Sequence, residues 1–248
     1  MEEKKEETFC DRLCSSKFAY NLTLAICPIV ATHLKTALDE GKDYNSLGTA
    51  NEKKLKSILG LFSNLKTVVE DIEKVFVFLR YEAITPLKEL YPLLDKEEDY
   101  YKYHLENYFI RIAMIPDALV KIGNFVNPWG LSTNCYGTTL LDSKKNANVE
   151  QEAIDLMQKL IDKIKEIRDL RNNKIHVGVT EIPYLSDIVW WNDFEIPGMS
   201  RDELLVGWDE QKKKRQFDDL EKSVFEVIDI VKDFLDLMAE KVNDLVEQ

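Results

Sequence analysis

A run of apolar residues at helical spacing between Asn51 and Leu79 limits the possible folds more than any other part of this sequence. The apolar positions recur at steps of three and four residues over about seven turns, which is the period of one helix face. Similar patterns run from about Glu98 to Val126 and from about Trp208 to Val246. Because each helix must bury its apolar face against another, the sequence predicts an all-α antiparallel bundle with long irregular connections.

Composition agrees with a helical fold and gives no sign of a domain boundary. The chain of 248 residues contains 9 glycines and 7 prolines, which is sparse for an all-β or loop-rich protein. No change in composition marks a linker. We therefore expect a single domain over residues 1–248, with loop elaborations at about 127–148 and 179–207.

The N-terminal helical pattern contains a proline. Apolar residues keep helical spacing from Phe9 to about Leu38, and Gly41 is a plausible stop. Pro28 lacks an amide hydrogen, so we expect one helix kinked at Pro28 or two short helices. His33 lies on or near the apolar face, where a partly buried histidine with satisfied hydrogen bonds is expected.

Charge and hydropathy limit the partners. The formal net charge of −12 repels a nucleic-acid backbone, so nucleic-acid binding would need a local basic patch. The segment Lys212–Arg215 could supply one, although such a cluster is more often a solvated face. The N-terminus has no apolar signal region, and no run of 18 apolar residues follows. We therefore expect a cytoplasmic protein with no membrane partner.

Four tyrosines could stack on nucleic-acid bases, but aromatic residues on a helix more often pack against other helices. They are Tyr100, Tyr101, Tyr103 and Tyr108.

The motifs of common metal and cofactor sites are missing from the sequence. It contains no glycine-rich phosphate loop, no H-E-x-x-H and no G-x-S-x-G, and only three histidines. The cysteines lack zinc-ligand spacing, and the intracellular setting favours reduced thiols. Cys10 and Cys14 are one turn apart, where we expect small core residues. We expect neither a bound metal nor a cofactor.

One helix end gathers the polar residues best suited to chemistry. An amphipathic pattern begins near Val149 and leads through Arg168 to the segment Arg171–Gly178. The residues predicted on its buried face are Ala153, Leu156, Met157, Leu160, Ile164, Ile167 and Leu170. Asn172 and His176, four residues apart, share a helix face. Arg171 is turned about 140° away from His176, so it must reach round the helix or meet that face through a second subunit.

These residue types allow two interpretations. His176, with an ordinary pKa near about 6.5, suits proton transfer, and Arg171 and Lys174 could neutralise a phosphate. Together they could cleave RNA without a metal, with a base taking the 2′-hydroxyl proton while cations stabilise the developing charge. Alternatively, cationic residues near a helix C-terminus, followed by Gly178, are what the helix dipole and C-capping favour.

The segment Arg171-Asn172-Asn173-Lys174-Ile175-His176 resembles the signature of the HEPN superfamily, an arginine followed after four to six residues by a histidine. The long connections make this chain similar to a larger HEPN-like protein. The resemblance implies a helical bundle that dimerises, with two motifs forming a composite site. It also implies a metal-independent endoribonuclease acting on single-stranded RNA. In that case Arg171 and His176 are catalytic, Asn172 orients the site, and Lys174 and Arg168 support substrate binding.

The family resemblance leaves two function classes open. Some members of the superfamily are toxins paired with an antitoxin protein, or phage-defence components. Others have lost activity and serve as dimerisation or protein-interaction modules. The full motif favours the enzyme, whereas the net charge of −12 favours the interaction module.

Overall fold

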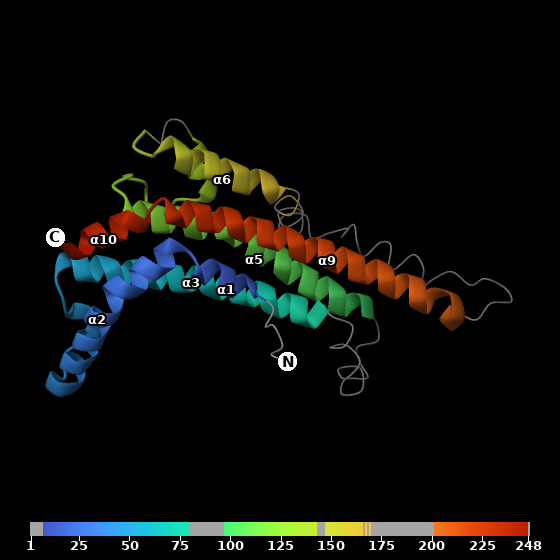
Figure 1. Cartoon of the computed structure of the whole chain (residues 1–248), viewed down its shortest axis with the longest axis horizontal. Coiled ribbons are helices and arrows are strands. Elements are labelled where there is room, and N and C mark those ends of the chain that lie inside the picture. The colour runs from blue at the N-terminus through green and yellow to red at the C-terminus, as the bar shows by residue number, and fades with distance from the viewer. Residues whose placement is uncertain are drawn as a thin grey trace, which may run out of the picture. The chain divides into compact units, whose positions relative to one another are not determined.

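The computed structural model of the chain describes residues 7–79, 97–142, 147–165, 167, 169 and 201–247, with the backbone alone at 97–99, 201–214, 216 and 247. These residues form helices and no strand, so the predicted all-α class is confirmed (Figure 1). The elements are α1 (Phe9–Cys14), α2 (Lys17–Glu40), η1 (Tyr44–Ser46), α3 (Ala50–Leu79), α5 (Glu97–Val126), η2 (Gly137–Leu141), α6 (Gln151–Lys163), α9 (Arg201–Asp236) and α10 (Ala239–Glu247).

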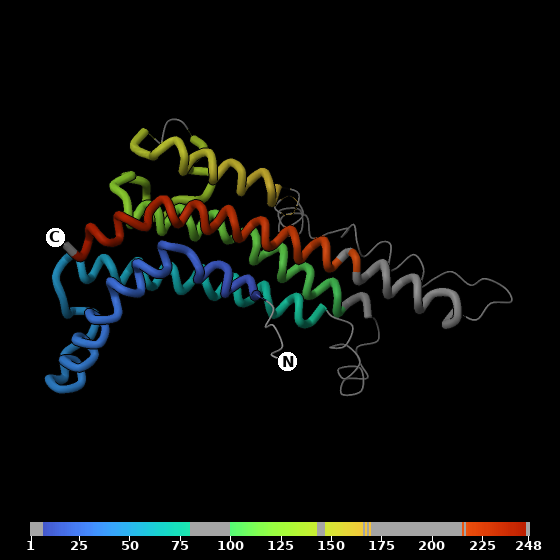
Figure 2. Tube along the Cα trace, in the orientation of Figure 1, coloured from blue at the N-terminus to red at the C-terminus, as the bar shows by residue number. Residues whose placement is uncertain are grey.

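The chain divides into two compact units. The first unit comprises Met1–Glu70, Met114–Ile164 and Val227–Gln248, and the second comprises Asp71–Ala113 and Lys165–Glu226. The long helices α3, α5 and α9 each contribute residues to both units. Figure 2 shows the path of the chain from its N-terminus to its C-terminus.

In the second unit α3 and α5 pack antiparallel. Arg111 forms an ion pair of 3.2 Å with Asp71, and the Tyr100 hydroxyl donates a hydrogen bond of 2.7 Å to the carbonyl oxygen of Phe78. The contact residue later in α3, Phe78, meets the one earlier in α5, Tyr100, so the two helices run in opposite directions. Apolar side chains on both helices are buried between these polar contacts, including Ile72, Phe76, Tyr108 and Ile112.

In the first unit, side-chain hydrogen bonds join the N-terminal helices to the C-terminal ones. The Arg12 guanidinium donates two hydrogen bonds, of 2.6 and 2.8 Å, to the Asp229 carboxylate. The buried Asn21 side chain donates to the backbone carbonyl of Ala239 at 2.9 Å. Because all three hydrogen bonds join residues more than two hundred positions apart, they hold α1 and α2 against α9 and α10.

The first helical pattern is interrupted before Pro28 and not at it. The chain breaks at Ser15 and Ser16, where the Ser16 hydroxyl accepts from the amide of Ala19 at 3.1 Å and caps α2. Pro28 lies inside α2, so of the two alternatives predicted for Pro28 the single helix is the correct one and the division into two short helices is not found. Gly41 ends α2 with φ of 66°, the left-handed conformation that glycine adopts readily.

Helix α2 is apolar on average. Within the part of the chain that the structure describes, its length and composition would permit it to cross a membrane. The core helices of water-soluble proteins also meet this criterion of length and composition. Just 22% of its most apolar window is buried.

The last helical pattern is divided in two. We expected one helix from about Trp208 to Val246, but α9 begins at Arg201 and ends at Asp236. A turn at Leu237 and Met238 separates it from α10, with the Met238 amide bonding the carbonyl of Leu235 at 2.9 Å. Residues 201–207 were expected to be irregular but are helical. The residues of high helix propensity in this segment outweigh the low propensity of Gly207.

The connection after α5 is irregular but closely packed where it is described. The Asn124 side chain exchanges two hydrogen bonds of 2.9 Å with the backbone of Leu131. The ring of Trp129 packs so closely on α5 that a Cβ added at Gly123 would lie 2.2 Å from it. These contacts give residues 127–142 a defined path that includes η2.

Two expectations about buried side chains need correction. Cys14 is exposed and Cys10 is half-buried, because this edge of α1 faces outward, so neither is a core residue. Their sulfur atoms lie 3.9 Å apart. His33 is buried as expected, and its Nε2 lies 3.8 Å from the Glu52 carboxylate, but its Nδ1 has no hydrogen-bond partner among the described residues.

Candidate functional site

The predicted site residues Arg168, Arg171, Asn172, Lys174 and His176 lie outside the described residues. Their mutual arrangement therefore stays a prediction. The described part of the helix leading to them is α6, followed by helical positions at 165, 167 and 169.

The face that α6 was predicted to bury is largely confirmed. Leu156 and Ile167 are half-buried, whereas Leu170 lies outside the described residues. The fully buried side chains follow the expected three- and four-residue steps and include one, Ile161, that was not predicted: Ala153, Met157, Leu160, Ile161 and Ile164.

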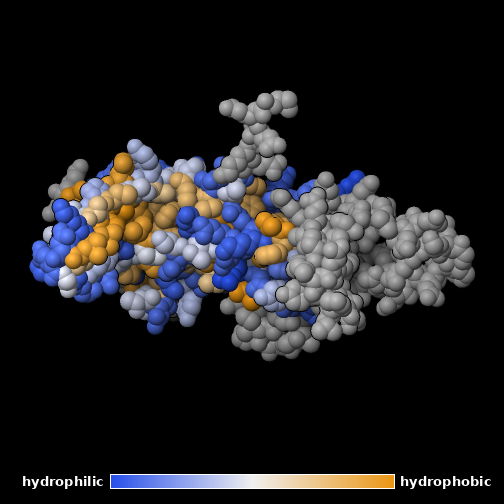
Figure 3. All heavy atoms as spheres, turned by 90° about the horizontal axis from the view of Figure 1, so that it is seen from below, coloured by the Kyte–Doolittle hydropathy of each residue, from blue (hydrophilic) through white to orange (hydrophobic). Residues whose placement is uncertain are grey.

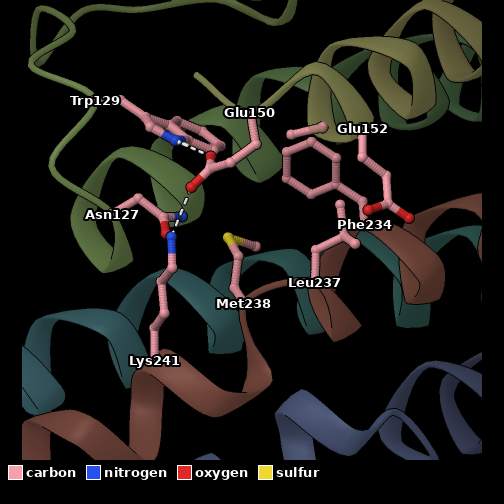
Figure 4. Close-up of a pocket in the computed structure, with 9 residues that line it drawn as sticks. Asn127, Trp129, Glu150, Glu152, Phe234, Leu237, Met238 and Lys241 are labelled. Carbon is pink, nitrogen blue, oxygen red and sulfur yellow. Dashed lines mark hydrogen bonds and ion pairs between the residues drawn. The ribbon is translucent and has the colours of Figure 1, made fainter. Parts of the chain in front are cut away.

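The Glu150 carboxylate holds the start of α6 in place through hydrogen bonds. Glu150 occupies the N-cap position, but its side chain does not cap the helix. Instead one carboxylate oxygen accepts a hydrogen bond of 2.7 Å from the Trp129 indole, and the other accepts one of 2.6 Å from the Lys241 ammonium (Figure 4). Three segments, the connection after α5, the start of α6 and α10, therefore meet at Glu150.

The surroundings of Glu150 act on its pKa in opposite directions. Partial burial raises the pKa, because it disfavours the charged carboxylate. The hydrogen bonds from Lys241 and Trp129 lower it and outweigh burial, so the pKa lies below its usual value. Glu150 is charged at neutral pH and is engaged on both oxygens, an arrangement suited to holding structure rather than to transferring protons.

A cavity of about 180 Å³ opens beside this contact. Figure 4 shows Phe234, Leu237 and Met238 along its apolar side and Lys241 at its polar side. The buried Asn127 amide donates to the carbonyl of Gly123 at 3.2 Å, but its Oδ1 has no partner among the described residues. The cavity thus offers one buried acceptor, which suits a water molecule or another small hydrogen-bond donor.

Sequence reasoning did not single out these pocket residues. Trp129 was expected to lie in an irregular connection, and Lys241 is 91 residues from Glu150 along the chain. The Asn127-Pro128-Trp129 segment directly after a helix was the available signal, since a tryptophan in a loop needs a place to bury.

The aromatic residues weighed as base-stacking candidates mostly pack the interior. Tyr100, Tyr101 and Tyr108 are buried, so the packing interpretation is confirmed for them, whereas Tyr103 is exposed. The His104 ring stacks on Phe78 with centroids 4.9 Å apart. Burial lowers the pKa of His104, which keeps it neutral at pH 7.

Two other kinds of site were considered from the sequence, a metal site and a basic patch for nucleic acid. They contain no group of three or more histidine, cysteine, aspartate or glutamate side chains placed to hold a metal ion. In the basic segment Lys212–Arg215, the backbone belongs to α9 and the Arg215 side chain is exposed, as on a solvated face.

The fold and the sequence around α6 together define the class of protein. The described chain is an all-α protein in which a helix buried on one face, α6, leads directly to a cluster of cationic and histidine residues.

Comparison with known protein families then identifies the family. The family model described as HEPN_Cthe2314-like HEPN matches residues 64–245, well over half of the chain. The chain therefore belongs to the HEPN_Cthe2314-like family of the HEPN superfamily. Comparisons with curated proteins and with solved structures give no match.

Proposed function

We propose that this protein is a metal-independent endoribonuclease of HEPN type whose catalytic residues are Arg171 and His176. One observation carries the proposal: the segment Arg171–His176 carries the superfamily's arginine-to-histidine signature and lies within the residues matched by the family model.

The proposed reaction is an internal transfer at a phosphodiester. His176 takes the proton from the RNA 2′-hydroxyl, and the 2′-oxygen then forms a bond to phosphorus as the bond to the 5′-oxygen breaks. Arg171 and Lys174 stabilise the negative charge that grows on the phosphate oxygens, and Asn172 orients the site. Arg168 assists by binding the substrate backbone. The 5′-oxygen takes a proton from water as it leaves and becomes the 5′-hydroxyl of one product. The other product carries the 2′,3′-cyclic phosphate that the attack of the 2′-oxygen forms.

We also propose that the protein acts in the cytoplasm as a homodimer. Arg171 and His176 point about 140° apart on one ideal helix, and a two-fold axis near the helix end would set each His176 beside the Arg171 of the other copy. The substrate is single-stranded RNA. A toxin or phage-defence role, with an antitoxin protein as partner, fits this chemistry.

The test compares the wild-type protein with His176→Ala and Arg171→Ala on mixed single-stranded RNA. Lys165→Ala is the matched control, since Lys165 is exposed at a described helical position before the motif. We expect each motif substitution to reduce cleavage by at least about 100-fold and the control to cut normally. Equal circular dichroism spectra would exclude unfolding as the cause.

If the wild-type protein leaves RNA intact, or if both variants cut as well as it does, the enzyme proposal fails. The alternative would then apply, a catalytically inactive HEPN-like module for dimerisation or protein interaction.

A further inference from the structure

Helix α1 carries two cysteines whose sulfur atoms lie close together. Cys10 and Cys14 are one helical turn apart, and their Sγ atoms are separated by 3.9 Å. Cys14 is exposed and Cys10 is half-buried, so a small molecule in solution can reach Cys14 first. The two thiols therefore form a pair with one accessible member.

Two charged side chains of α3 lie beside this pair. The Cys10 thiol donates a hydrogen bond of 3.9 Å to Oε1 of Glu70, and the same oxygen lies 3.3 Å from the Lys66 ammonium. The pKa of Lys66 is raised, first by its hydrogen bond to Glu70 and then by the charges of Cys10, Glu70 and Cys14. Lys66 is therefore near enough to both sulfur atoms to attract a thiolate there. All four residues belong to the first unit.

These groups are the ones that thiol–disulfide exchange needs. The attacking species is an accessible thiolate, and a neighbouring ammonium attracts its negative charge. A second thiol must lie close enough to attack the same sulfur atom afterwards, and a carboxylate can take the proton of that second thiol. Cys14 and Lys66 supply the first two groups, and Cys10 and Glu70 supply the others.

We propose that Cys10 and Cys14 form a redox-active dithiol, which a low-molecular-weight disulfide such as oxidised glutathione converts reversibly to an internal disulfide. The Cys14 thiolate attacks one glutathione sulfur, forms a mixed disulfide and releases one glutathione thiolate. Glu70 then takes the proton of Cys10, and the Cys10 sulfur attacks the Cys14 sulfur, releasing the second glutathione thiolate. The protein gives up two electrons and two protons, and oxidised glutathione becomes two glutathione thiols.

The end of α1 can accommodate the internal disulfide. An ideal helix sets the Cα atoms of residues four apart at about 6.2 Å, within the range of about 4.4–6.8 Å that disulfides span. The Cβ atoms, about 5–6 Å apart in a helix, must approach to about 3.5–4.5 Å, so the last turn has to change shape. Cys14 is the last residue of α1, so this change interrupts no longer helix.

The turn that changes shape also carries a contact to α9. Arg12 lies between the two cysteines, and its guanidinium donates the two hydrogen bonds to Asp229. Oxidation therefore weakens the contact that holds α1 against α9. Disulfides of cytosolic proteins are usually transient and serve catalysis or sensing, which fits a reversible change of this kind.

Cys10 and Cys14 lie outside residues 64–245, which the family model matches. The redox pair therefore goes beyond the proposed nuclease and does not rest on it.

The exposed Cys27 provides a reference thiol within the same chain. It lies in α2, and hydrophobic side chains are visible at the left of Figure 3, where α2 lies. No second cysteine stands three or four residues away from it in the sequence. A mixed disulfide on Cys27 therefore has no neighbouring thiol in its own helix to displace the glutathione.

Mass spectrometry of the full chain after treatment with oxidised glutathione tests the pair. The Cys27→Ser protein keeps the pair and lacks the other exposed thiol. It should lose two hydrogen atoms and yield a peptide that joins Cys10 to Cys14. The internal disulfide should be at least about 10-fold more abundant than the mixed disulfide with glutathione, because Cys10 attacks from within the same helix. Dithiothreitol should reverse the change.

Two variants are matched controls. Cys10→Ser/Cys27→Ser lacks the second thiol and should stop at a mixed disulfide on Cys14. Cys10→Ser/Cys14→Ser keeps Cys27 and should stop at a mixed disulfide there. The proposal is overturned if the Cys27→Ser protein accumulates glutathione on Cys14 without closing the internal disulfide. It is also overturned if that protein stays reduced while Cys27 reacts, or if its disulfides join only separate chains.

Urea denaturation tests the link to α9. Oxidation should lower the urea midpoint of the Cys27→Ser protein. The shift should be at least about two-fold smaller in Arg12→Ala/Cys27→Ser, because that variant has already lost the contact with Asp229. Equal shifts in the two proteins, or a midpoint that rises on oxidation, would contradict the link.

Discussion

At the residue scale, Glu150 shows how one side chain joins segments that are distant in sequence. It accepts hydrogen bonds from a buried tryptophan and from a lysine of α10, and the helix that leads to the HEPN motif begins at the next residue. Because Trp129 is 2% exposed, its indole N–H would have no solvent to bond if Glu150 were shortened.

Glu150→Ala should therefore lower the free energy of unfolding by about 1–2 kcal/mol at pH 7. Glu150→Gln should cost less, about 0.5 kcal/mol, because the amide can still accept from Trp129 while the half-exposed ion pair with Lys241 is lost. Urea denaturation measures both values. Glu152→Ala, at an exposed position in the same turn, is the control and should change stability least.

The charged form of Glu150 should also make this contribution depend on pH. The folded protein lowers the pKa of Glu150, so the stabilisation is present above the ordinary glutamate pKa and is lost as pH falls through the lowered value. The difference between wild type and Glu150→Gln should shrink as the pH is lowered from about 5 to 3. A difference that grew towards acid pH would contradict this assignment.

At the scale of helices, the apolar period predicted which segments are helical better than it predicted where they end. The helices α3 and α5 have nearly the bounds that their patterns indicate, because each is long and periodic throughout. The break at Ser16 and the turn at Leu237 were missed. A serine cap and a two-residue turn leave the apolar period almost unchanged, so the pattern carries no signal for either.

Two glycines inside helices should respond to alanine in opposite ways. Gly60 of α3 has open space around its missing Cβ, so Gly60→Ala should stabilise the protein by about 0.5–1 kcal/mol by reducing unfolded-state entropy. At Gly123 of α5 a Cβ would lie 2.2 Å from the Trp129 ring, so Gly123→Ala should destabilise the protein by about 1–3 kcal/mol.

Thermal or urea unfolding of the two variants provides the comparison. Because the same substitution is made in both helices, helix propensity is matched and packing accounts for the difference in sign. A stabilising Gly123→Ala would show that Trp129 does not pack against α5 as described.

At the scale of the whole molecule, the sequence indicated the fold class and the superfamily because both depend on repeated or local features. A 3.6-residue period is visible at every turn, and the motif from Arg171 to His176 is contiguous. The pocket beside Glu150 was not predictable in this way, since Trp129, Glu150 and Lys241 are brought together by tertiary packing alone.

The net charge of the whole molecule bears on the proposed action on RNA. A charge of −12 repels the phosphate backbone on average, so the proposed RNA binding would have to rest on the cationic residues that the sequence gathers around the motif. The chemistry proposed for that motif has a distinctive product, because the RNA's own 2′-oxygen is the nucleophile and no metal-bound water takes part.

The most direct measurement is therefore the chemistry of the new RNA ends formed by wild-type protein in excess EDTA. We expect continued cleavage, with 2′,3′-cyclic phosphate on one fragment and a 5′-hydroxyl on the other, and no such ends with His176→Ala. Cleavage that stops in EDTA, or fragments that carry 5′-phosphate and 3′-hydroxyl ends, would contradict it.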